Sequence, residues 1–243
     1  MERRVKVCSP LYLIAKIRNS YGQGWGLYVA VIAPDRQIHA CNLPARSMTK
    51  SSGDYLKILL DHGLELGDSG NGLLYDYLKV MPVPRLAQIV NRLGWYKSAY
   101  VMPDAVYGDL NGEMIVPQDE LLHGSPFQQE GSLQEWQVNV GRFCVGNSRL
   151  ILGVCAALAT PLLHLLNMEG GGFHYFGLSS IGKTTLLLVA GSTCGGGSPR
   201  GYLRQWRATD NALEIIAAIF NDSLLCLDEI GQASARVVSE VAY

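Results

Sequence analysis

One stretch of the chain has the residue types and spacing of a phosphate-binding loop. Residues 177–184 read Gly-Leu-Ser-Ser-Ile-Gly-Lys-Thr and fit the pattern G-x-x-x-x-G-K-[ST] without a mismatch. In such a loop the glycines let backbone N–H groups point at phosphate oxygens, the lysine reaches the β- and γ-phosphates, and the threonine hydroxyl ligates Mg²⁺. The pattern therefore predicts a site for ATP and Mg²⁺. The residues expected to hold the nucleotide are Gly177, Ser179, Ser180, Ile181, Gly182, Lys183, Thr184 and Thr185.

The residues around this loop favour the order strand, loop, helix that phosphate loops require. The aromatic run 173–176 (Phe-His-Tyr-Phe) predicts a short buried strand, and the apolar run 185–190 predicts a helix that ends before Gly195. That helix would present its N-terminus, which carries a partial positive charge, to the same anion.

A second motif follows in the acidic pair at the end of an apolar run. Residues 224–229 read Leu-Leu-Cys-Leu-Asp-Glu, which predicts a buried strand that ends in two carboxylates. Asp228 is expected to hold Mg²⁺, Glu229 to polarise the attacking water, and Lys183 to act with them in catalysis. The alternative is a glycine-rich turn before a helix plus an unrelated acidic turn, and the agreement of two independent motifs in order and spacing weighs against it.

The composition of the chain limits its possible fold classes and partners. The 243 residues are 48% hydrophobic and 17% charged, which favours one or two domains with a sizeable core over a disordered chain. The net charge of −1 gives no overall basic footprint for nucleic acid, although local basic patches stay open. Six scattered cysteines without a C-x-x-C pair indicate reduced thiols and a cytoplasmic location.

One segment is long and apolar enough to need a membrane test. Residues 150–166 are nearly all apolar, but they include Pro161 and His164 and have a centre of Gly and Ala. A span needs about 20 apolar residues. We therefore expect a buried helix packed closely against a sheet, and no membrane partner.

Two halves of different character are expected, with a boundary near 124–131. Residues 1–130 predict an α+β domain that begins with an antiparallel meander over 7–45. Residues 131–243 predict a helical lead-in and a P-loop core of α/β class, in which helices flank a parallel sheet. A capping box, Ser132-Leu133-Gln134-Glu135, should start the lead-in helix. The helices expected in the first half are 54–62, 73–79 and 84–93, and its later short strands are 94–95, 100–102 and 114–116.

Several strings together resemble a known family. They are 25–27 (Trp-Gly-Leu), 94–95 (Gly-Trp), 146–149 (Gly-Asn-Ser-Arg), 179–185, 206–214 (Trp-Arg-Ala-Thr-Asp-Asn-Ala-Leu-Glu) and 226–229. The chain resembles, over nearly its whole length, the bacterial domain-of-unknown-function family found in predicted primase–helicase proteins of mobile elements, the Cch-like helicases. The resemblance implies an AAA-like or superfamily-3-like helicase ATPase, a hexameric ring, DNA as partner, and work in the replication of phages, plasmids or integrated elements.

The end of the sequence departs from such an ATPase. Tyr243 follows Glu229 closely, whereas a ring ATPase needs further strands for a sensor residue and an arginine finger. We therefore expect a C-terminally truncated core with an incomplete parallel sheet. Such a core would still bind ATP but would not hydrolyse it rapidly.

A weaker candidate site and three function classes stay open. Arg204, Trp206 and Arg207 are candidates for a contact with nucleic acid or a neighbouring subunit, against the alternative of a packing tryptophan and solvated arginines. The chain is expected to be an ATP-driven helicase subunit, a non-helicase nucleotide-dependent switch, or an inactive scaffold.

Overall fold

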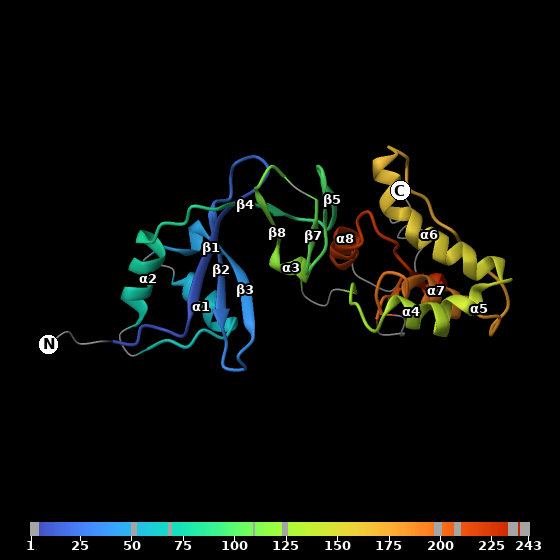
Figure 1. The fold of residues 1–243 in the computed structure, drawn as a ribbon, viewed down its shortest axis with the longest axis horizontal. Helices are drawn as coiled ribbons and strands as arrows, with labels where there is room; N and C mark the ends of the chain where they lie inside the picture. Colours follow the sequence, from blue (N-terminus) through green and yellow to red (C-terminus); the bar gives the residue numbers. More distant parts are fainter. Residues whose placement is uncertain are drawn as a thin grey trace. The chain divides into compact units, whose positions relative to one another are not determined.

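The computed structural model describes residues 5–49, 53–67, 70–108, 110–122, 126–196, 201–206, 210–232 and 238 (Figure 1). The chain forms two compact units. The first combines Met1–Asn91 with Asp109–Glu120, and the second combines Arg92–Gly108 with Leu121–Tyr243. The units therefore do not follow a single cut in the chain. The domain division at 1–130 and 131–243 stays a prediction, because compactness alone does not define a domain.

The first unit is built on a five-stranded mixed sheet with the order β3-β2-β1-β4-β8. Its strands are β1 (Leu11–Arg18), β2 (Gly26–Ile32), β3 (Ile38–Pro44), β4 (Leu86–Val90) and β8 (Met114–Pro117). The first three form an antiparallel meander, which confirms that prediction, while β4 pairs in parallel with both β1 and β8.

One face of this sheet packs against two helices, α1 (Asp54–Asp61) and α2 (Gly70–Val80). Alternation along the strands puts Val29 and Leu43 on this face, where both are fully buried with Leu59 and Leu74 of the helices. The two helices predicted around 54–62 and 73–79 are therefore confirmed, and their apolar stripes are what covers the sheet.

The helix predicted over 84–93 is wrong, because these residues contain strand β4. Ala87 pairs with Ile17 on one side and with Met114 on the other, and its side chain is fully buried. A segment with a strand on each side forms two hydrogen-bonded ladders. The stabilisation from these ladders exceeds the weak preference for a helix that the periodicity indicates.

The second unit combines a small antiparallel sheet, a parallel strand pair and a group of helices. The sheet contains β5 (Gly94–Tyr96), β6 (Ala99–Val101) and β7 (Val106–Tyr107), and the pair contains β9 (Arg204–Gln205) and β10 (Leu227–Asp228). The helices are α4 (Leu133–Trp136), a π-helical turn (Gln137–Gly141), α5 (Arg142–Cys144), α6 (Ser148–Leu165), α7 (Lys183–Gly191) and α8 (Asp210–Ile219). The remaining elements of the described residues are short: η1 (Ala45–Ser47), α3 (Asp119–Leu122) and η3 (Ile230–Gln232).

The capping box predicted at the start of the lead-in helix is confirmed. The Ser132 side chain accepts a hydrogen bond from the Glu135 backbone N–H, and the Glu135 carboxylate accepts one from the Ser132 backbone N–H. This reciprocal pair satisfies two N–H groups that a helix start otherwise leaves open.

An aromatic cluster forms the core beneath α7 and the parallel strand pair. Tyr202 is fully buried, with its ring 5.0 Å from that of Phe220 and 5.7 Å from that of Phe127. Burial raises the pKa of the Tyr202 hydroxyl, which stays protonated and donates to the Leu224 carbonyl. The cluster thereby ties the end of α7, where Gly191 lies against Tyr202, to the chain that leads into β10.

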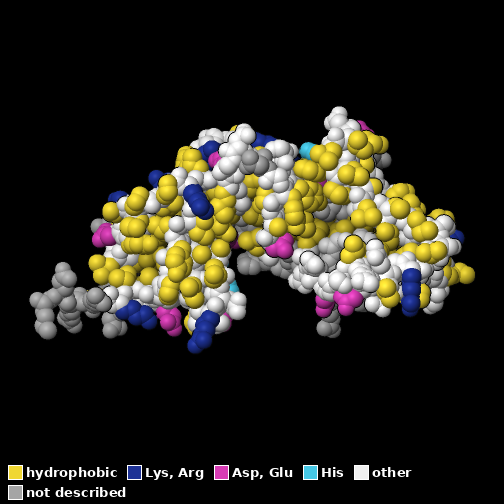
Figure 2. Space-filling model, viewed as in Figure 1, with side chains coloured by type: hydrophobic (Ala, Val, Ile, Leu, Met, Phe, Trp, Pro, Cys, Tyr) yellow, Lys and Arg dark blue, Asp and Glu magenta, His cyan; other side chains and the backbone are white. Residues whose placement is uncertain are grey.

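Helix α6 does not have the buried setting expected for residues 150–166. It packs mainly against α7, through a narrow stripe in which a Cβ at Gly153 would lie 3.3 Å from the Ala190 methyl group. Its Pro161 carbonyl also accepts a hydrogen bond from Trp95 of the small sheet. Only 11% of the 18-residue helix is buried, and Leu158 and Leu162 are 61% and 51% exposed. Figure 2 shows hydrophobic side chains, in yellow, at the surface over α6. By length and composition alone, α6 could cross a membrane. Small residues bury little apolar area, so a Gly/Ala stripe covers one side of the helix only.

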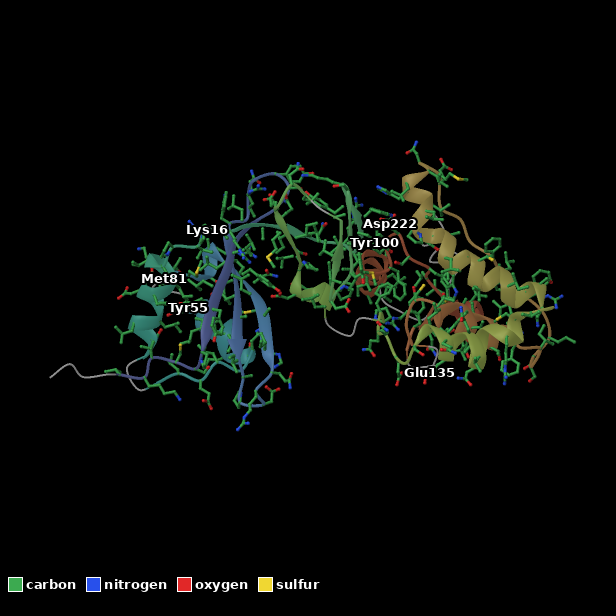
Figure 3. All side chains as sticks on the ribbon, viewed as in Figure 1. Lys16, Tyr55, Met81, Tyr100, Glu135 and Asp222 are labelled. Atoms are coloured by element: carbon green, nitrogen blue, oxygen red, sulfur yellow. The ribbon has the colours of Figure 1, made fainter. Side chains whose placement is uncertain are left out.

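The family string at 94–95 has a structural explanation in the second unit. The Trp95 backbone N–H donates to Asp222 Oδ2 over 2.8 Å, and its indole N–H donates to the Pro161 carbonyl over 2.7 Å. The Tyr100 hydroxyl donates to the Asp222 carbonyl (Figure 3). Gly94 precedes this contact with a φ of +85°, which favours glycine. The string therefore joins the small sheet to α6 and to the segment after α8.

Candidate nucleotide-binding site

The loop at 177–182 leads directly into the N-terminus of α7. Gly182 is the residue before the helix and has a φ of +90°, a conformation in which a side chain is strained. Ser180 also has a positive φ, at +63°. This backbone course brings Lys183 and Thr184 into the first turn of the helix, whose free N–H groups and dipole favour an anion.

The Lys183 ammonium group lies over its own loop. Nζ donates to the Gly177 carbonyl over 3.0 Å and to the Leu178 carbonyl over 2.7 Å. An ammonium group has three donors, so one stays available for a phosphate oxygen, and the two bonds already formed hold the side chain over the loop. Sequence reasoning missed the role of the Leu178 carbonyl, because a backbone acceptor leaves no signal in residue type.

Thr184 lies within hydrogen-bond distance of Asp228, the first residue of the acidic pair. The Thr184 hydroxyl donates to Asp228 Oδ2 over 2.9 Å, and Asp228 Oδ1 accepts the Glu229 backbone N–H over 2.9 Å. Both carboxylate oxygens therefore have a fixed direction. One of them faces the helix that carries Lys183.

The parallel pairing of β10 with β9 sets the position of Asp228. Asp228 lies opposite Gln205 in the ladder, and the Trp206 backbone N–H donates to the Asp228 carbonyl over 3.3 Å. Just before β10, the Cys226 thiol donates to the Leu187 carbonyl of α7. The acid is therefore held by a strand that contacts both its ladder partner and the helix after the loop.

The side chains of Thr184 and Asp228 fit Mg²⁺. Both supply the hard oxygen ligands that this ion prefers. Neighbouring ligands of an octahedral ion with bonds of 2.0–2.1 Å lie about 2.9 Å apart, which matches the Oγ1 to Oδ2 distance of 2.9 Å. These two residues could hold the ion directly or through water without a large rearrangement.

Glu229 follows in a conformation that few non-glycine residues adopt. Its φ is +60° and its side chain is exposed. Backbone strain of this kind costs about 1–3 kcal/mol and clusters at functional sites. The hydrogen bond from the Glu229 backbone N–H to Asp228 Oδ1 holds this turn.

The strand predicted over 173–176 is wrong. These residues have no regular structure, and Phe173 and Phe176 are 63% and 83% exposed. The two described strands of this parallel sheet, β9 and β10, pair with each other and not with this segment. Aromatic residues favour strands only where a neighbouring strand supplies a ladder and a surface to pack on. In the described part of the chain the parallel sheet therefore has two strands, which is less than the core predicted from the motif.

The three residues of the weaker candidate site have different surroundings. Arg204 Nη1 donates to the Gly201 and Leu203 carbonyls, and its guanidinium lies 5.5 Å from the centre of the Phe220 ring. Burial lowers the pKa of this guanidinium. Trp206 is half-buried, and Arg207 lies outside the described residues. A contact of these residues with nucleic acid or another subunit stays a prediction.

Three comparisons with known proteins complete the description of the site. A family model described as "Domain of unknown function (DUF927)" matches residues 1–243. Among solved structures, the chain is similar to one titled "SCCmec type IV Cch - active helicase", with a TM-score of 0.74 and 19% sequence identity. The match covers 100% of this chain and 48% of that one, so this chain spans about half the length of the similar structure. No curated protein matches.

Proposed function

We propose that this chain, which belongs to the DUF927 family, binds ATP with Mg²⁺ at the loop 177–184 and hydrolyses it. Lys183 would contact the β- and γ-phosphates, Thr184 and Asp228 would hold the metal, and Glu229 would orient the attacking water. Mg²⁺ would neutralise charge on the phosphates. The nucleotide would drive a helicase-like protein in the DNA replication of a mobile element or phage, in the cytoplasm.

The observation that carries this proposal is the hydrogen bond between Thr184 and Asp228. Two motifs found separately in the sequence meet at hydrogen-bond distance, with the lysine in the adjacent position of the same helical turn. An unrelated glycine-rich turn and an unrelated acidic turn would have no reason to meet. The N-terminus of α7, which favours anions, completes the arrangement.

The helicase part of the proposal has a different basis. The solved structure with a similar fold is titled as an active helicase, and the fold similarity extends over all of this chain. The chain spans about half of that structure. We therefore propose that it is the part of a helicase that binds and hydrolyses the nucleotide, and that this hydrolysis drives strand separation. We propose a hexameric ring for full-length members of the family on the resemblance alone.

Nucleotide binding is tested by calorimetric titration of the chain with ATP, in Mg²⁺ and in EDTA. We expect binding that weakens in EDTA and is abolished by Lys183→Ala. Lys97→Ala is the matched control, because Lys97 belongs to the same unit and lies over the Tyr96 ring instead. Equal affinity of the Lys183→Ala variant and the parent chain would contradict the site.

DNA-stimulated turnover separates the helicase from the nucleotide-dependent switch. Phosphate release measured with and without single-stranded DNA should rise with DNA for a helicase subunit. A rate of phosphate release that is the same with and without DNA, combined with nucleotide-dependent binding of a protein partner, would favour the switch. Unchanged behaviour of every assay after Lys183→Ala would favour an inactive scaffold.

A further inference from the structure

The first unit contains a cavity of about 400 Å³ that the nucleotide site does not use. Its walls come from β1, the start of β2, the turn η1 with the residue after it, and α2. Volumes of roughly 300–1,000 Å³ are typical of small-molecule sites. All of its lining residues belong to one compact unit, so the cavity needs no contribution from the other.

Two lysines reach this cavity from different elements. Lys16, labelled in Figure 3, lies on β1. It is opposite Leu27 in the β1–β2 ladder, so the two side chains share a face of the sheet, and both line the cavity. Lys79 lies in the last turn of α2. Neither lysine forms an ion pair with a carboxylate of the described residues, and no Asp or Glu lines the cavity. Two ammonium groups that have no carboxylate partner among the described residues favour an anion.

Two aromatic side chains lie beside the lysines. Trp25 is 45% exposed, although indole rings are usually more buried, and it precedes β2. Tyr75, Leu78 and Lys79 follow the i, i+3, i+4 spacing of one helix face, and Lys79 Nζ lies 5.9 Å from the centre of the Tyr75 ring. Aromatic faces beside cationic groups are the combination by which proteins hold bases and their phosphates.

Part of the cavity lining is apolar and buried. Leu27 and Leu78 are each only 6% exposed and belong to the core between the sheet and the helices. The ligand is therefore expected to have a flat apolar part that enters the cavity and a negative part that stays at its mouth. An acidic peptide has the charge without the ring, and a neutral aromatic compound has the ring without the charge.

We propose that this cavity binds a nucleobase that carries a phosphate, with the ring against Trp25 and Tyr75 and the phosphate between Lys16 and Lys79. The base and its phosphate can belong to a single-stranded nucleic acid or to a free nucleotide. The site is separate from the loop at Lys183 and does not depend on ATP binding there. It gives the first unit a role in holding a nucleic-acid strand or a nucleotide.

Fluorescence anisotropy of a labelled twelve-nucleotide oligothymidylate, titrated with the whole chain in EDTA at several salt concentrations, tests the strand as source. Loss of one base stack lowers affinity roughly ten- to a hundredfold, which is the result expected for Trp25→Ala. Each phosphate contact on a single strand contributes about 0.7 to the slope of log affinity against log salt. The double variant Lys16→Gln, Lys79→Gln should therefore lower that slope by about 1.4.

Matched controls come from the same unit. The double variant Lys6→Gln, Lys57→Gln removes two lysines that pair with Glu65 and Asp54 outside the cavity, and Tyr21→Ala removes an aromatic ring that is 86% exposed. Both should leave affinity and salt slope unchanged. Trp25→Phe keeps a ring and should keep most of the affinity, so the proposal stays testable if Trp25→Ala unfolds.

Free nucleotide is tested by titrating thymidine monophosphate into the Lys183→Ala variant, in which the other site is disabled. Binding that Trp25→Phe retains and the double variant Lys16→Gln, Lys79→Gln loses, without oligonucleotide binding, would assign the cavity to a free nucleotide. The proposal is overturned if neither ligand binds, if the cavity variants behave like the controls, or if an oligoglutamate peptide binds with the same dependence on Trp25.

Discussion

The Thr184 hydroxyl and the Asp228 carboxylate form a 2.9 Å hydrogen bond across an interval of 44 residues. Thr184 is held by the first turn of α7, and Asp228 by its pairing with Gln205 in the parallel ladder. Because a helix holds one side chain and a strand pair holds the other, regular secondary structure positions both partners of this hydrogen bond. It makes these two side chains the best positions at which to test the candidate metal site.

Removal of the Thr184 hydroxyl should weaken metal-dependent nucleotide binding. Thr184→Val keeps the shape of the side chain but supplies no oxygen ligand, so we expect Mg²⁺–ATP affinity to fall at least about tenfold. Thr184→Ser keeps the hydroxyl and should restore most of it. Thr160→Val is the control, because the Thr160 hydroxyl donates to the Ala156 carbonyl within α6, and calorimetry measures all four proteins. A Thr184→Val variant that binds as tightly as Thr184→Ser would refute the assignment.

Glu229→Gln should separate binding from hydrolysis. The amide keeps the size of the side chain but cannot accept a proton, and loss of a general base costs roughly 10²–10⁴ in rate. Phosphate release should therefore fall by that factor while ATP affinity changes little. Glu169→Gln alters an exposed carboxylate of the same unit and should leave the rate unchanged. Similar rates for the two variants would remove Glu229 from the mechanism.

Gly94→Ala should destabilise the second unit. Gly94 has a φ of +85°, and a Cβ there would collide with the Asn221 carbonyl and lie 2.7 Å from Asp222 Oδ2. We expect a loss of about 2–4 kcal/mol from strain and from the weakened bond between Trp95 and Asp222.

Gly171→Ala provides the control for that substitution, because a Cβ at Gly171 meets nothing within 4 Å. Differential scanning fluorimetry should show the melting temperature of the Gly94→Ala variant lowered by roughly 5–10 °C and that of Gly171→Ala nearly unchanged. Equal melting temperatures would show that the family string at 94–95 does not join the small sheet to its neighbours.

Burial of Cys41 predicts a pH dependence of stability on the alkaline side. Burial raises the pKa of the Cys41 thiol from 9.0 to about 12, so the folded state keeps this proton while the unfolded state loses it. The stabilisation is fully present below pH 9 and is lost as the pH rises from 9 toward 12, by up to about 1.4 kcal/mol per pH unit.

A Cys41→Ala variant isolates this contribution. Its free energy of unfolding, measured with urea from pH 8 to pH 11, should fall less steeply above pH 9 than that of the parent chain. Cys155→Ala removes an exposed thiol and should retain the steeper slope. Parallel curves for the parent chain and Cys41→Ala would contradict the prediction.

Local chemistry made several parts of this protein predictable from its sequence. The capping box at Ser132 needs only residues three positions apart, and the meander follows from alternation along each strand. The motifs at Lys183 and Asp228 depend on residue types at short fixed spacing. Such features are set by interactions between near neighbours in the chain, and the sequence contains all of their partners.

The errors arose where a distant partner decides the outcome. Residues 86–90 form a strand because β1 and β8 flank them, and Phe173 to Phe176 form none because no described strand pairs with them. Helix α6 was expected to be buried, but it buries only the stripe that contains Gly153 and Ala157. Propensity and hydrophobicity indicate which secondary structures a segment can form. A neighbouring strand or an apolar surface then stabilises one of them.

By itself, the sequence determined the residue pattern of the loop at 177–184, the acidic pair and the capping box at Ser132, because each depends on residue types within a few positions. Only the tertiary structure decided that Thr184 meets Asp228, and that Lys16, Trp25 and Lys79 surround one cavity. Those contacts join elements far apart in the chain, and their free energy exists only once the sheets and helices have packed.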